Sequence, residues 1–521
     1  MDKRKRQVRQ DILLTVACPF LPERAKVLEI ASGTRQHAVY IASQRPDIVW
    51  QPSDRDDESV RSIEEWRFGI SSKTSSDSII ERRSSIVFRL AFSRLKAKLP
   101  LLRIQFKTLK GSAMKFMPRI LVSSCLAATF TLGCADQKTM SQALGYVEEP
   151  VAVLVSSMLI AQIDQANLTQ KLASYGIVPR NGVKIYRLSY NTLAPDQSAV
   201  KASGVIILPD TQSPVFPWIS LQHGTILAKS EAPSLAPGEG LAEASQGFLT
   251  VVPDYLGYGD SADLLHPYII EAGYVAPLLD MLRATREFAS TTKLNLGPLF
   301  LKGYSEGGYA TLALQKAIET DSEGEFTIAA SSASAGPYDV DYTGTLTAQK
   351  PKINPGNIPF LMLSYNHWLA NDTLPLSEIF VPSEATVSDA LNGSHSLQEI
   401  FKILPSDTNA LFKADFITDF VGAHPTLDVS KKIHKLLKSQ SLVAGPWVPS
   451  SPTRFYHCVD DEQIPVAVTE KTATTFKNLG APVEAILIPS MDISHPFTHT
   501  TCPAIFSPIK WFAQILSGSA A

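Results

Sequence analysis

The chain contains 521 residues, of which 45% are hydrophobic and 19% are charged, and its formal net charge is −2. This length predicts two or more segments of globular type, and the near-neutral charge gives no reason to expect a nucleic acid as a partner. Lys and Arg are concentrated in residues 1–119, whereas the longer remainder is mildly acidic. We therefore expect two unrelated parts.

Residues 27–34 (VLEIASGT) form a short apolar run with a turn of small residues, and Asp54 ends a second run about 20 residues later. Together, LEIASGTRQHAVYIA and WQPSDRD resemble the start of a family of S-adenosylmethionine-dependent methyltransferase-like proteins, which implies a βαβ unit that binds a nucleotide. The family has Gly where this chain has Arg35, and the resemblance stops at about Trp66. An open two-strand fragment cannot bury a core, so we predict that residues 1–68 are truncated and non-functional.

Residues 69–113 are first rich in serine and charge and then basic, which predicts a linker without a defined fold. A different pattern follows: Met114 begins a short basic region, residues 120–133 are mostly apolar, and Cys134 comes next. This order is typical of a secretory signal peptide. The apolar run is short for a membrane span, and a buried or membrane-surface helix is the alternative.

The ending Leu132-Gly133-Cys134 resembles a bacterial lipobox, which implies that Cys134 becomes a lipidated N-terminus. Because signal peptides stand at the start of a chain, we hypothesise that the working protein begins at Met114 and that residues 1–113 come from a misplaced start codon or a gene fusion. The protein would then be exported, as a periplasmic or outer-membrane lipoprotein or in secreted form. The lipid would attach it to a membrane.

From residue 135 onward, strand and helix signals alternate. Residues 141–175 are predicted to be helical. Strands are predicted at residues 183–190, 204–208, 218–222, 249–253, 299–301, 327–330, 454–457 and 483–488. Further helices are predicted at residues 271–290, 309–320, 465–479 and 502–516. This alternation after an early antiparallel hairpin predicts an α/β fold, with a mostly parallel sheet that is covered by helices on both faces.

A G-x-S-x-G motif, from Gly303 to Gly307, stands between the predicted strand 299–301 and the predicted helix 309–320. In this context of strand, tight turn and helix, the motif presents a nucleophilic serine at the tip of a sheet. The helix N-terminus behind the serine helps to stabilise an oxyanion. We therefore predict that Ser305 is the nucleophile; a plain structural turn is the alternative.

Another predicted strand ends in His223-Gly224-Thr225. In serine hydrolases with this motif, the loop after such a strand supplies one backbone N–H of the oxyanion hole, and the residue after the nucleophile supplies the other. The predicted donors are therefore the N–H of Thr225 or Ile226 and the N–H of Glu306. The side chain of His223 is predicted to be structural rather than catalytic.

The acid and the base should follow the nucleophile in the order Asp or Glu, then His. The segment HCVDDEQIP, residues 457–465, resembles the H-G-x-x-D-x-x-V-P acid loop of such enzymes, and this spacing selects Asp461, with Asp460 as the fallback. His499 stands between the last predicted strand and the last predicted helix. It is the predicted base, and His495 is the alternative.

Two cysteines flank the predicted acid and base. Cys458 lies three residues before Asp461, and Cys502 lies three residues after His499. A base that is hydrogen-bonded to its acid brings the two loops together, so we expect a Cys458–Cys502 disulfide. Export to an oxidising compartment agrees with such a pair, and two buried free thiols are the alternative.

Taken together, HGT, PDYLGYGDS, GYSEGGYA, HCVDDEQIP and the histidine before WF resemble bacterial alpha/beta-hydrolase esterases related to secretory lipases. The resemblance covers residues 150–521. It implies an alpha/beta-hydrolase fold and hydrolysis of carboxylic esters through an acyl-enzyme, with neither a cofactor nor a metal. Roughly 120 residues separate two of the predicted strands, which is too many for a simple connection. We therefore predict a cap at residues 342–449, inserted over the active site.

A small-molecule or lipid ester is the expected substrate. Three other functions stay open. The chain could be a serine peptidase of the same fold, a lipid-anchored binding protein without catalysis, or a methyltransferase that uses residues 10–68.

Overall fold

The computed structural model describes residues 152–173, 176–321, 323–490 and 496–518 and, near the N-terminus, the backbone of two strands. The chain divides into two compact units, Met1–Glu149 and Pro150–Ala521. In the first unit, β1 (Val27–Ser32) and β2 (His37–Ala42) pair as an antiparallel hairpin. The predicted βαβ unit pairs the first strand with a second run that ends at Asp54, and this second run lies outside the described residues. The predicted linker, signal peptide and lipidated Cys134 lie outside the described residues.

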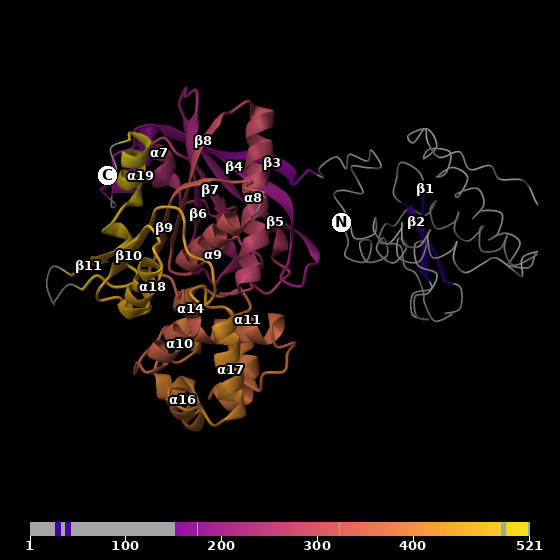
Figure 1. The fold of residues 1–521 in the computed structure, drawn as a ribbon, viewed down its shortest axis with the longest axis vertical. Helices are drawn as coiled ribbons and strands as arrows, with labels where there is room; N and C mark the ends of the chain where they lie inside the picture. The colour runs from indigo at the N-terminus through magenta and orange to yellow at the C-terminus, as the bar shows by residue number, and fades with distance from the viewer. Residues whose placement is uncertain are drawn as a thin grey trace, which may run out of the picture. The chain divides into compact units, whose positions relative to one another are not determined.

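The second unit is organised around a nine-stranded sheet with the order β11-β10-β9-β8-β6-β7-β5-β4-β3 (Figure 1). Its strands are β3 (Leu154–Ile163), β4 (Gly182–Leu193), β5 (Ala199–Asp210), β6 (Phe216–Gln222), β7 (Leu249–Pro253), β8 (Leu296–Tyr304), β9 (Ile328–Ser334), β10 (Thr453–Cys458) and β11 (Val483–Ile488). β6 to β11 run parallel, whereas β3, β4 and β5 pair antiparallel along one edge. The predicted α/β class with a mostly parallel sheet is confirmed.

Helices cover both faces of this sheet. α6 (Gln165–Leu172), α7 (Leu241–Ser245) and α19 (Pro508–Leu516) pack on one face, and α8 (Glu271–Thr292), α9 (Glu306–Thr320) and α18 (Val466–Asn478) pack on the other. Because side chains alternate along a strand, β8 feeds both cores. Leu299 and Leu301 lie in the core under α8 and α9, whereas Phe300 stacks on Phe512 of α19 with ring centroids 4.6 Å apart.

A helical cap lies between β9 and β10 in the sequence. It comprises α10 (Val340–Ala348), α11 (Ile358–Trp368), α12 (Leu376–Ile379), α13 (Glu384–Ala390), α14 (Leu397–Ile403), α15 (Thr408–Leu411), α16 (Ala414–Phe420) and α17 (Asp428–Ser439). The cap helices gather beyond one end of the sheet (Figure 1). Since α10 begins shortly after β9 ends, this is the end at which the parallel strands have their carboxyl termini, where ligand sites of α/β sheets lie.

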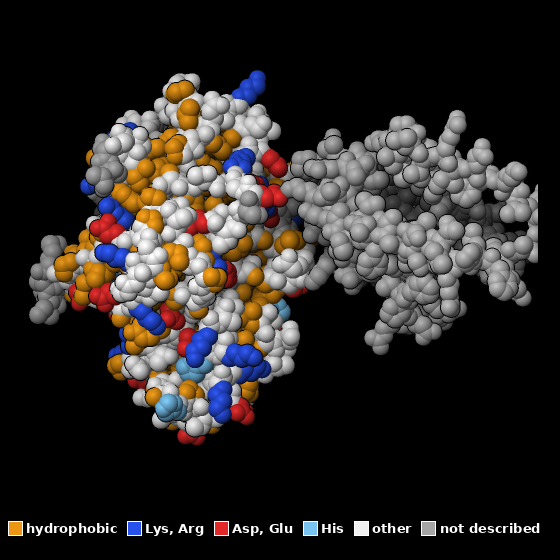
Figure 2. Space-filling model, in the orientation of Figure 1, with side chains coloured by type: hydrophobic (Ala, Val, Ile, Leu, Met, Phe, Trp, Pro, Cys, Tyr) orange, Lys and Arg blue, Asp and Glu red, His pale blue; other side chains and the backbone are white. Residues whose placement is uncertain are grey.

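The helix α17 shows how the cap folds on a core of its own. Its buried residues, Val429, Ser430, Ile433 and Leu437, recur with helical spacing and pack inward. Lys431, Lys435 and Lys438 are exposed on its other side. Figure 2 shows blue basic side chains in the region of α17. Within the described part of the chain, no helix is long and apolar enough to cross a membrane.

Two predicted helices differ from the structure. Over the described part of residues 141–175, the chain forms β3 and the shorter α6 instead of one helix. β3 pairs along β4, so the hydrogen bonds offered by a sheet edge outweigh the local helical pattern. The helix predicted over residues 502–516 is divided into a short turn, η4 (Cys502–Ala504), and α19. α19 begins at Pro508, since a proline suits the first helical position.

Candidate active site

Ser305 occupies the turn between β8 and α9 with φ of 60° and ψ of −123°. A positive φ is strained for a residue with a side chain, and this sharp turn carries the hydroxyl out of the strand–helix connection. The neighbouring positions must be glycine because other backbone atoms lie too close to leave room for a side chain. A Cβ at Gly307 would lie 2.0 Å from Gln222 O, and a Cβ at Gly303 would lie 2.1 Å from Gly307 O. The G-x-S-x-G spacing is therefore a steric requirement of this turn.

Ser305, His499 and Asp461 form a continuous hydrogen-bonded row. His499 Nε2 lies 2.8 Å from Ser305 Oγ, and His499 Nδ1 lies 2.6 Å from Asp461 Oδ2. A carboxylate only accepts hydrogen bonds, so Nδ1 carries the hydrogen and Nε2 accepts the hydroxyl hydrogen of Ser305. The three residues follow β8, β10 and β11, whose carboxyl ends meet at one edge of the sheet.

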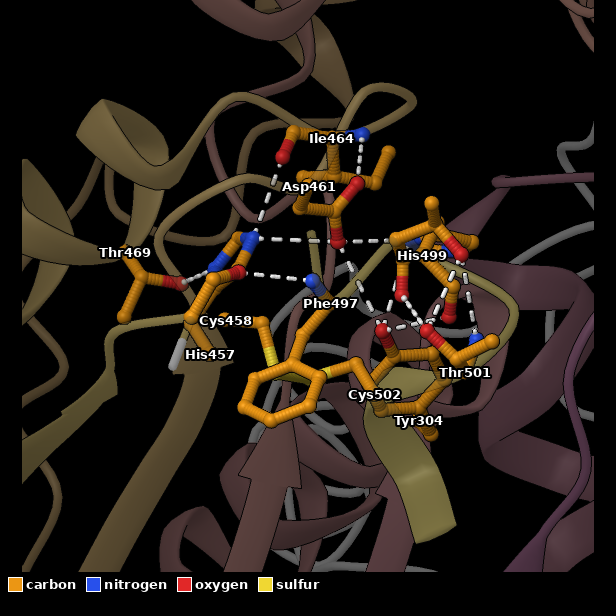
Figure 3. Close-up of a disulfide and its surroundings, with 12 residues drawn as sticks. Tyr304, His457, Cys458, Asp461, Ile464, Thr469, Phe497, His499, Thr501 and Cys502 are labelled. Atoms are coloured by element: carbon orange, nitrogen blue, oxygen red, sulfur yellow. Dashed lines mark hydrogen bonds and ion pairs between the residues drawn. A yellow bond between two sulfur atoms is a disulfide. The ribbon is translucent and has the colours of Figure 1, made fainter. Parts of the chain in front are cut away.

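Asp461 is buried between two histidines, His457 and His499 (Figure 3). Its Oδ1 accepts the N–H groups of Gln463 and Ile464, both at 2.9 Å, and its Oδ2 lies 3.2 Å from His457 Nε2. Burial by itself would raise the pKa of the Asp461 carboxyl. The hydrogen bonds from the two histidines together outweigh burial and hold this pKa well below its usual range. Asp461 therefore faces His499 as a carboxylate.

The two fallback residues are placed differently. Asp460 is exposed and takes no part in the row around His499. His495 lies outside the described residues. Of the two candidate acids, the structure thus brings only Asp461 to the histidine and the serine.

Cys458 and Cys502 form a disulfide with a Cα–Cα distance of 5.9 Å. Both residues are buried. Cys458 ends β10, just before the turn that carries Asp461, and Cys502 begins η4, just after His499 (Figure 3). The bond therefore fixes the loop of the acid against the loop of the histidine.

The predicted oxyanion-hole residues lie on two sides of Ser305. Glu306 follows it as the first residue of α9. On the other side is the loop after β6, where a Cβ added to Gly224 would lie 3.9 Å from Ser305 Cβ. Thr225 and Ile226 are the next residues of this loop. The structure thus brings the two predicted sources of N–H donors close to the serine.

Three tyrosines from the segment after β7 fix the loop that carries Thr225. Their contacts are Tyr255 OH to His223 O at 3.0 Å, Tyr258 OH to Ile226 O at 2.5 Å, and Tyr268 OH to Thr225 Oγ1 at 2.9 Å. The imidazole of His223 contacts backbone carbonyls, with Nδ1 2.7 Å from Gly224 O and Nε2 3.3 Å from Asp254 O. His223 therefore holds the loop in shape.

Comparison with protein families assigns the second unit to a known family. Residues 240–520 match the model of a family described as secretory lipase, and this match includes the serine, aspartate and histidine above. The chain belongs to the secretory lipase family. It is a carboxylic ester hydrolase, with a small-molecule ester as substrate. Residues 3–76 match a separate family, which is described as a protein of unknown function (DUF938).

Solved structures resemble this secretory lipase in fold. The rice cell wall degrading esterase LipA from Xanthomonas oryzae is 24% identical with a TM-score of 0.61, and the match covers 71% of this chain and all of that one. A putative hydrolase from Legionella pneumophila is 22% identical (TM-score 0.64, 71% and 100% coverage). Candida antarctica lipase A in its closed state is 16% identical (TM-score 0.51, 72% and 87% coverage). The likeness confirms the predicted alpha/beta-hydrolase fold.

The cap of the secretory lipase is hydrogen-bonded to the loop of Asp461. Lys350 Nζ donates to Glu462 O at 2.7 Å. Asn354 and Asn357 each donate from Nδ2 to Gln463 Oε1 at 3.1 Å. The first part of the cap therefore contacts the residues directly after Asp461. Among the described residues, no group of three His, Cys, Asp or Glu side chains is arranged to hold a metal ion.

Sequence reasoning missed three side chains around His499 and Asp461. Tyr304 OH donates to His499 O at 2.9 Å, and Glu462 Oε2 accepts the His499 N–H at 2.8 Å. His457 Nε2 contacts Asp461 while its Nδ1 lies 2.7 Å from Thr469 Oγ1. Tyr304 and Glu462 adjoin predicted site residues in the sequence, and His457 stands four positions before Asp461. Proximity in sequence was the available signal, but it does not give the direction of a side chain.

Proposed function

We propose that Ser305, His499 and Asp461 carry out the ester hydrolysis of this enzyme through an acyl-enzyme intermediate. The observation that carries this proposal is the row of hydrogen bonds from the serine hydroxyl through both imidazole nitrogens to a buried carboxylate. Nucleophile, base and orienting acid need this arrangement.

The steps follow from the direction of the hydrogen bonds. His499 Nε2 takes the hydroxyl proton as Ser305 Oγ attacks the carbonyl carbon of the ester. His499 then gives this proton to the leaving alkoxide, and an alcohol departs. A water molecule, deprotonated by the same nitrogen, attacks the acyl-enzyme and releases the carboxylic acid. Asp461 holds the tautomer and stabilises the imidazolium in both halves.

The N–H of Glu306 and the N–H of Thr225 or Ile226 are the proposed donors to the oxyanion. Glu306 stands at the N-terminus of α9, where backbone N–H groups and the helix dipole favour negative charge. The loop of Thr225 and Ile226 forms the other wall of the oxyanion hole, and hydrogen bonds from Tyr258 and Tyr268 hold it. Removal of one such donor typically lowers kcat by about 10²–10³-fold.

A small-molecule or lipid ester is the proposed substrate, and the cap is the proposed source of acyl-chain selectivity. The cap lies at the carboxyl ends of the strands that carry the site, and its described residues include many apolar side chains. Its hydrogen bonds to Glu462 and Gln463, in the loop of Asp461, support this role. A series of p-nitrophenyl esters from acetyl to palmitoyl tests this by the chain length at which kcat/KM is highest.

The decisive experiment compares the wild type with Ser305→Ala on those esters. The variant should lose activity and should no longer be labelled by a fluorophosphonate, because the nucleophilic oxygen is gone. Unchanged activity in the variant would refute the assignment of the nucleophile. A folded wild type that cleaves peptide amides but no ester would point to a peptidase, and one without any activity would point to a binding protein.

Export is consistent with membership of the secretory lipase family. We propose that residues 114–133 act as the export signal and that Cys134 carries a lipid that attaches the protein to a membrane. Metabolic labelling with a fatty acid should mark the wild type but not Cys134→Ser. Equal labelling of the two would exclude this modification.

A further inference from the structure

A buried pair of titratable side chains, His266 and Glu306, involves the residue that follows the nucleophile and has no part in the steps above. Both are nearly inaccessible, with exposed fractions of 3% and 2%. His266 Nε2 lies 2.9 Å from Glu306 Oε1, and Tyr274 OH donates to the same oxygen at 3.0 Å. Glu306 directly follows Ser305 as the first residue of α9, so the carboxyl group belongs to the same residue as one of the proposed oxyanion donors.

Hydrogen bonding determines how many protons the pair holds. His266 Nδ1 lies 2.7 Å from Leu256 O, and a carbonyl only accepts, so Nδ1 carries a hydrogen. A neutral imidazole of this tautomer has no hydrogen on Nε2, and the carboxylate of Glu306 has none either. The contact of 2.9 Å therefore needs one more proton, either on His266 or on Glu306. In both forms the pair has no net charge.

The surroundings of the pair are aromatic. The rings next to His266 are Tyr255, Tyr258, Tyr268, Tyr274 and Phe360, with centroids between 5.1 and 6.0 Å away. Burial raises the pKa of all four tyrosines, so they are neutral phenols. Among the described residues, His266 is the ion-pair partner of Glu306. Without the proton that they share, the residue that follows the nucleophile would carry an uncompensated buried carboxylate.

The same residues connect the two walls of the oxyanion hole. Tyr258 and Tyr268 pack on the ring of His266 and also hydrogen-bond to the loop of Thr225 and Ile226. Glu306 begins the opposite wall. The contact between His266 and Glu306 therefore joins the wall of the loop to the wall of the helix.

We propose that His266 and Glu306 are positioning residues for ester hydrolysis and that they share one buried proton. The shared proton leaves the pair without net charge next to the oxyanion hole. The contact between the two residues also keeps the two sides of the hole joined. This inference deepens the proposed function and depends on it. A bare carboxylate at this place would repel the developing oxyanion in a site from which water is excluded. Loss of the shared proton should therefore lower kcat more than it changes KM.

Three variants of the full chain test the shared proton. His266→Asn keeps a donor toward Leu256 O but leaves the Glu306 carboxylate with the hydrogen bond from Tyr274 and without a cationic partner. We expect kcat to fall by about 10²-fold, the size of losing one donor of the oxyanion hole. Glu306→Gln has no charge, and its amide N–H can donate to His266 Nε2 in place of the shared proton, so its kcat should be at least about tenfold higher than that of His266→Asn. The double variant His266→Asn/Glu306→Gln should have a kcat at least about tenfold higher than that of His266→Asn, because the uncompensated charge is gone.

This rescue separates a role of charge from a merely structural one. A structural role predicts that the double variant is as impaired as His266→Asn, or more so, and that result would overturn the inference. It would also be overturned if Glu306→Gln were as slow as His266→Asn. Ser305→Ala is assayed beside them. If it keeps activity, the proposed function fails; if it is inactive and no rescue occurs, only the inference fails.

A spectroscopic measurement covers the case in which His266→Asn does not fold. Proton NMR of the wild type should show a strongly deshielded resonance for the proton between His266 and Glu306. This resonance should be absent from Glu306→Gln and present in Asp461→Asn, which alters the contacts of Asp461 with His457 and His499 and leaves His266 and Glu306 intact. Its persistence in Glu306→Gln would overturn the shared proton.

Discussion

Asp461, the proposed acid of this secretory lipase, is held by contacts from several single side chains and backbone groups. Its carboxylate receives two backbone N–H groups and one contact from each of two histidines. Of these histidines, only His499 reaches the serine. The Nε2 of His457 lies near two acceptors, Ile464 O and the Asp461 carboxylate, so this nitrogen carries a hydrogen and donates. His457 therefore contacts the carboxylate but not the serine. The orientation and the charge of Asp461 are thus fixed from several sides.

Replacement of the acid tests this arrangement. Asp461→Asn keeps the shape of the side chain but presents an amide to His499 Nδ1, so the wrong imidazole tautomer is favoured. We expect kcat for p-nitrophenyl acetate to fall by about 10³–10⁴-fold. Asp460→Asn makes the same change of charge at the exposed neighbour, and its kcat should remain within about twofold of the wild type. Equal losses in the two variants would contradict the assignment of the acid.

The lowered pKa of Asp461 also predicts how stability depends on pH. A carboxyl group with a lower pKa in the folded state stabilises the fold above its unfolded value, about 3.9, and this contribution is lost as the pH falls through the folded value. The difference in free energy of unfolding between the wild type and Asp461→Asn should therefore be constant above about pH 5 and shrink below about pH 4. Urea titrations between pH 6 and pH 2 measure it, and a difference that does not change with pH would refute the prediction.

At the scale of elements, the site depends on connections between loops rather than on a rigid strand or helix. Ser305 is held by β8 and α9, but Asp461 and His499 both stand in turns after strands. The Cys458–Cys502 disulfide and the contact from Glu462 to the His499 N–H join these turns. Lys350 adds a bond from the cap. The geometry of the row therefore depends on cross-links among three segments.

The disulfide is the strongest of these cross-links. Its sequence separation is 44 residues, and closing a loop of this length stabilises a fold by about 3–4 kcal/mol in the chain-entropy model. We expect Cys458→Ala/Cys502→Ala to lose about this much free energy of unfolding in urea. The value of kcat should also fall, since the loop of His499 is released. As a control, reductant should destabilise the wild type but not the double variant; a wild type that does not respond to reductant would contradict the prediction.

At the scale of the whole molecule, the apolar cores that support the site belong to one unit. Both faces of the nine-stranded sheet and the core of the cap are built from residues of Pro150–Ala521. The hydrogen-bonded row and the disulfide belong to the same unit. Nothing in the proposed steps requires residues 1–149.

Removal of residues 1–149 tests this independence. The fragment 150–521 should fold cooperatively and hydrolyse p-nitrophenyl esters with kcat within about twofold of the full chain, because its core is complete. Thermal unfolding and steady-state kinetics of both proteins measure this. A fragment that is unfolded or inactive while the full chain is active would show that the first unit contributes to the fold or the site.

The sequence by itself determined the fold class and predicted the residues of the proposed site. Periodicity located the strands of the parallel sheet, because buried strands are short apolar runs between turn signals. Motif order then selected Ser305, Asp461 and His499, since nucleophile, acid and base follow different strands in a fixed sequence. The cysteine pair followed from the expected contact between acid and base. These features are local, or depend on order along the chain.

The tertiary structure decided what depends on partners distant in sequence. The segment 154–163 has a helical pattern but forms β3, because β4 offers an edge to pair with. His266 stands 40 residues before Glu306, and no local spacing indicates that the two meet. The same holds for Tyr304, Glu462 and His457, whose directions are set by the packing around His499 and Asp461. A motif names the residues of a site, but packing decides which side chains point into it.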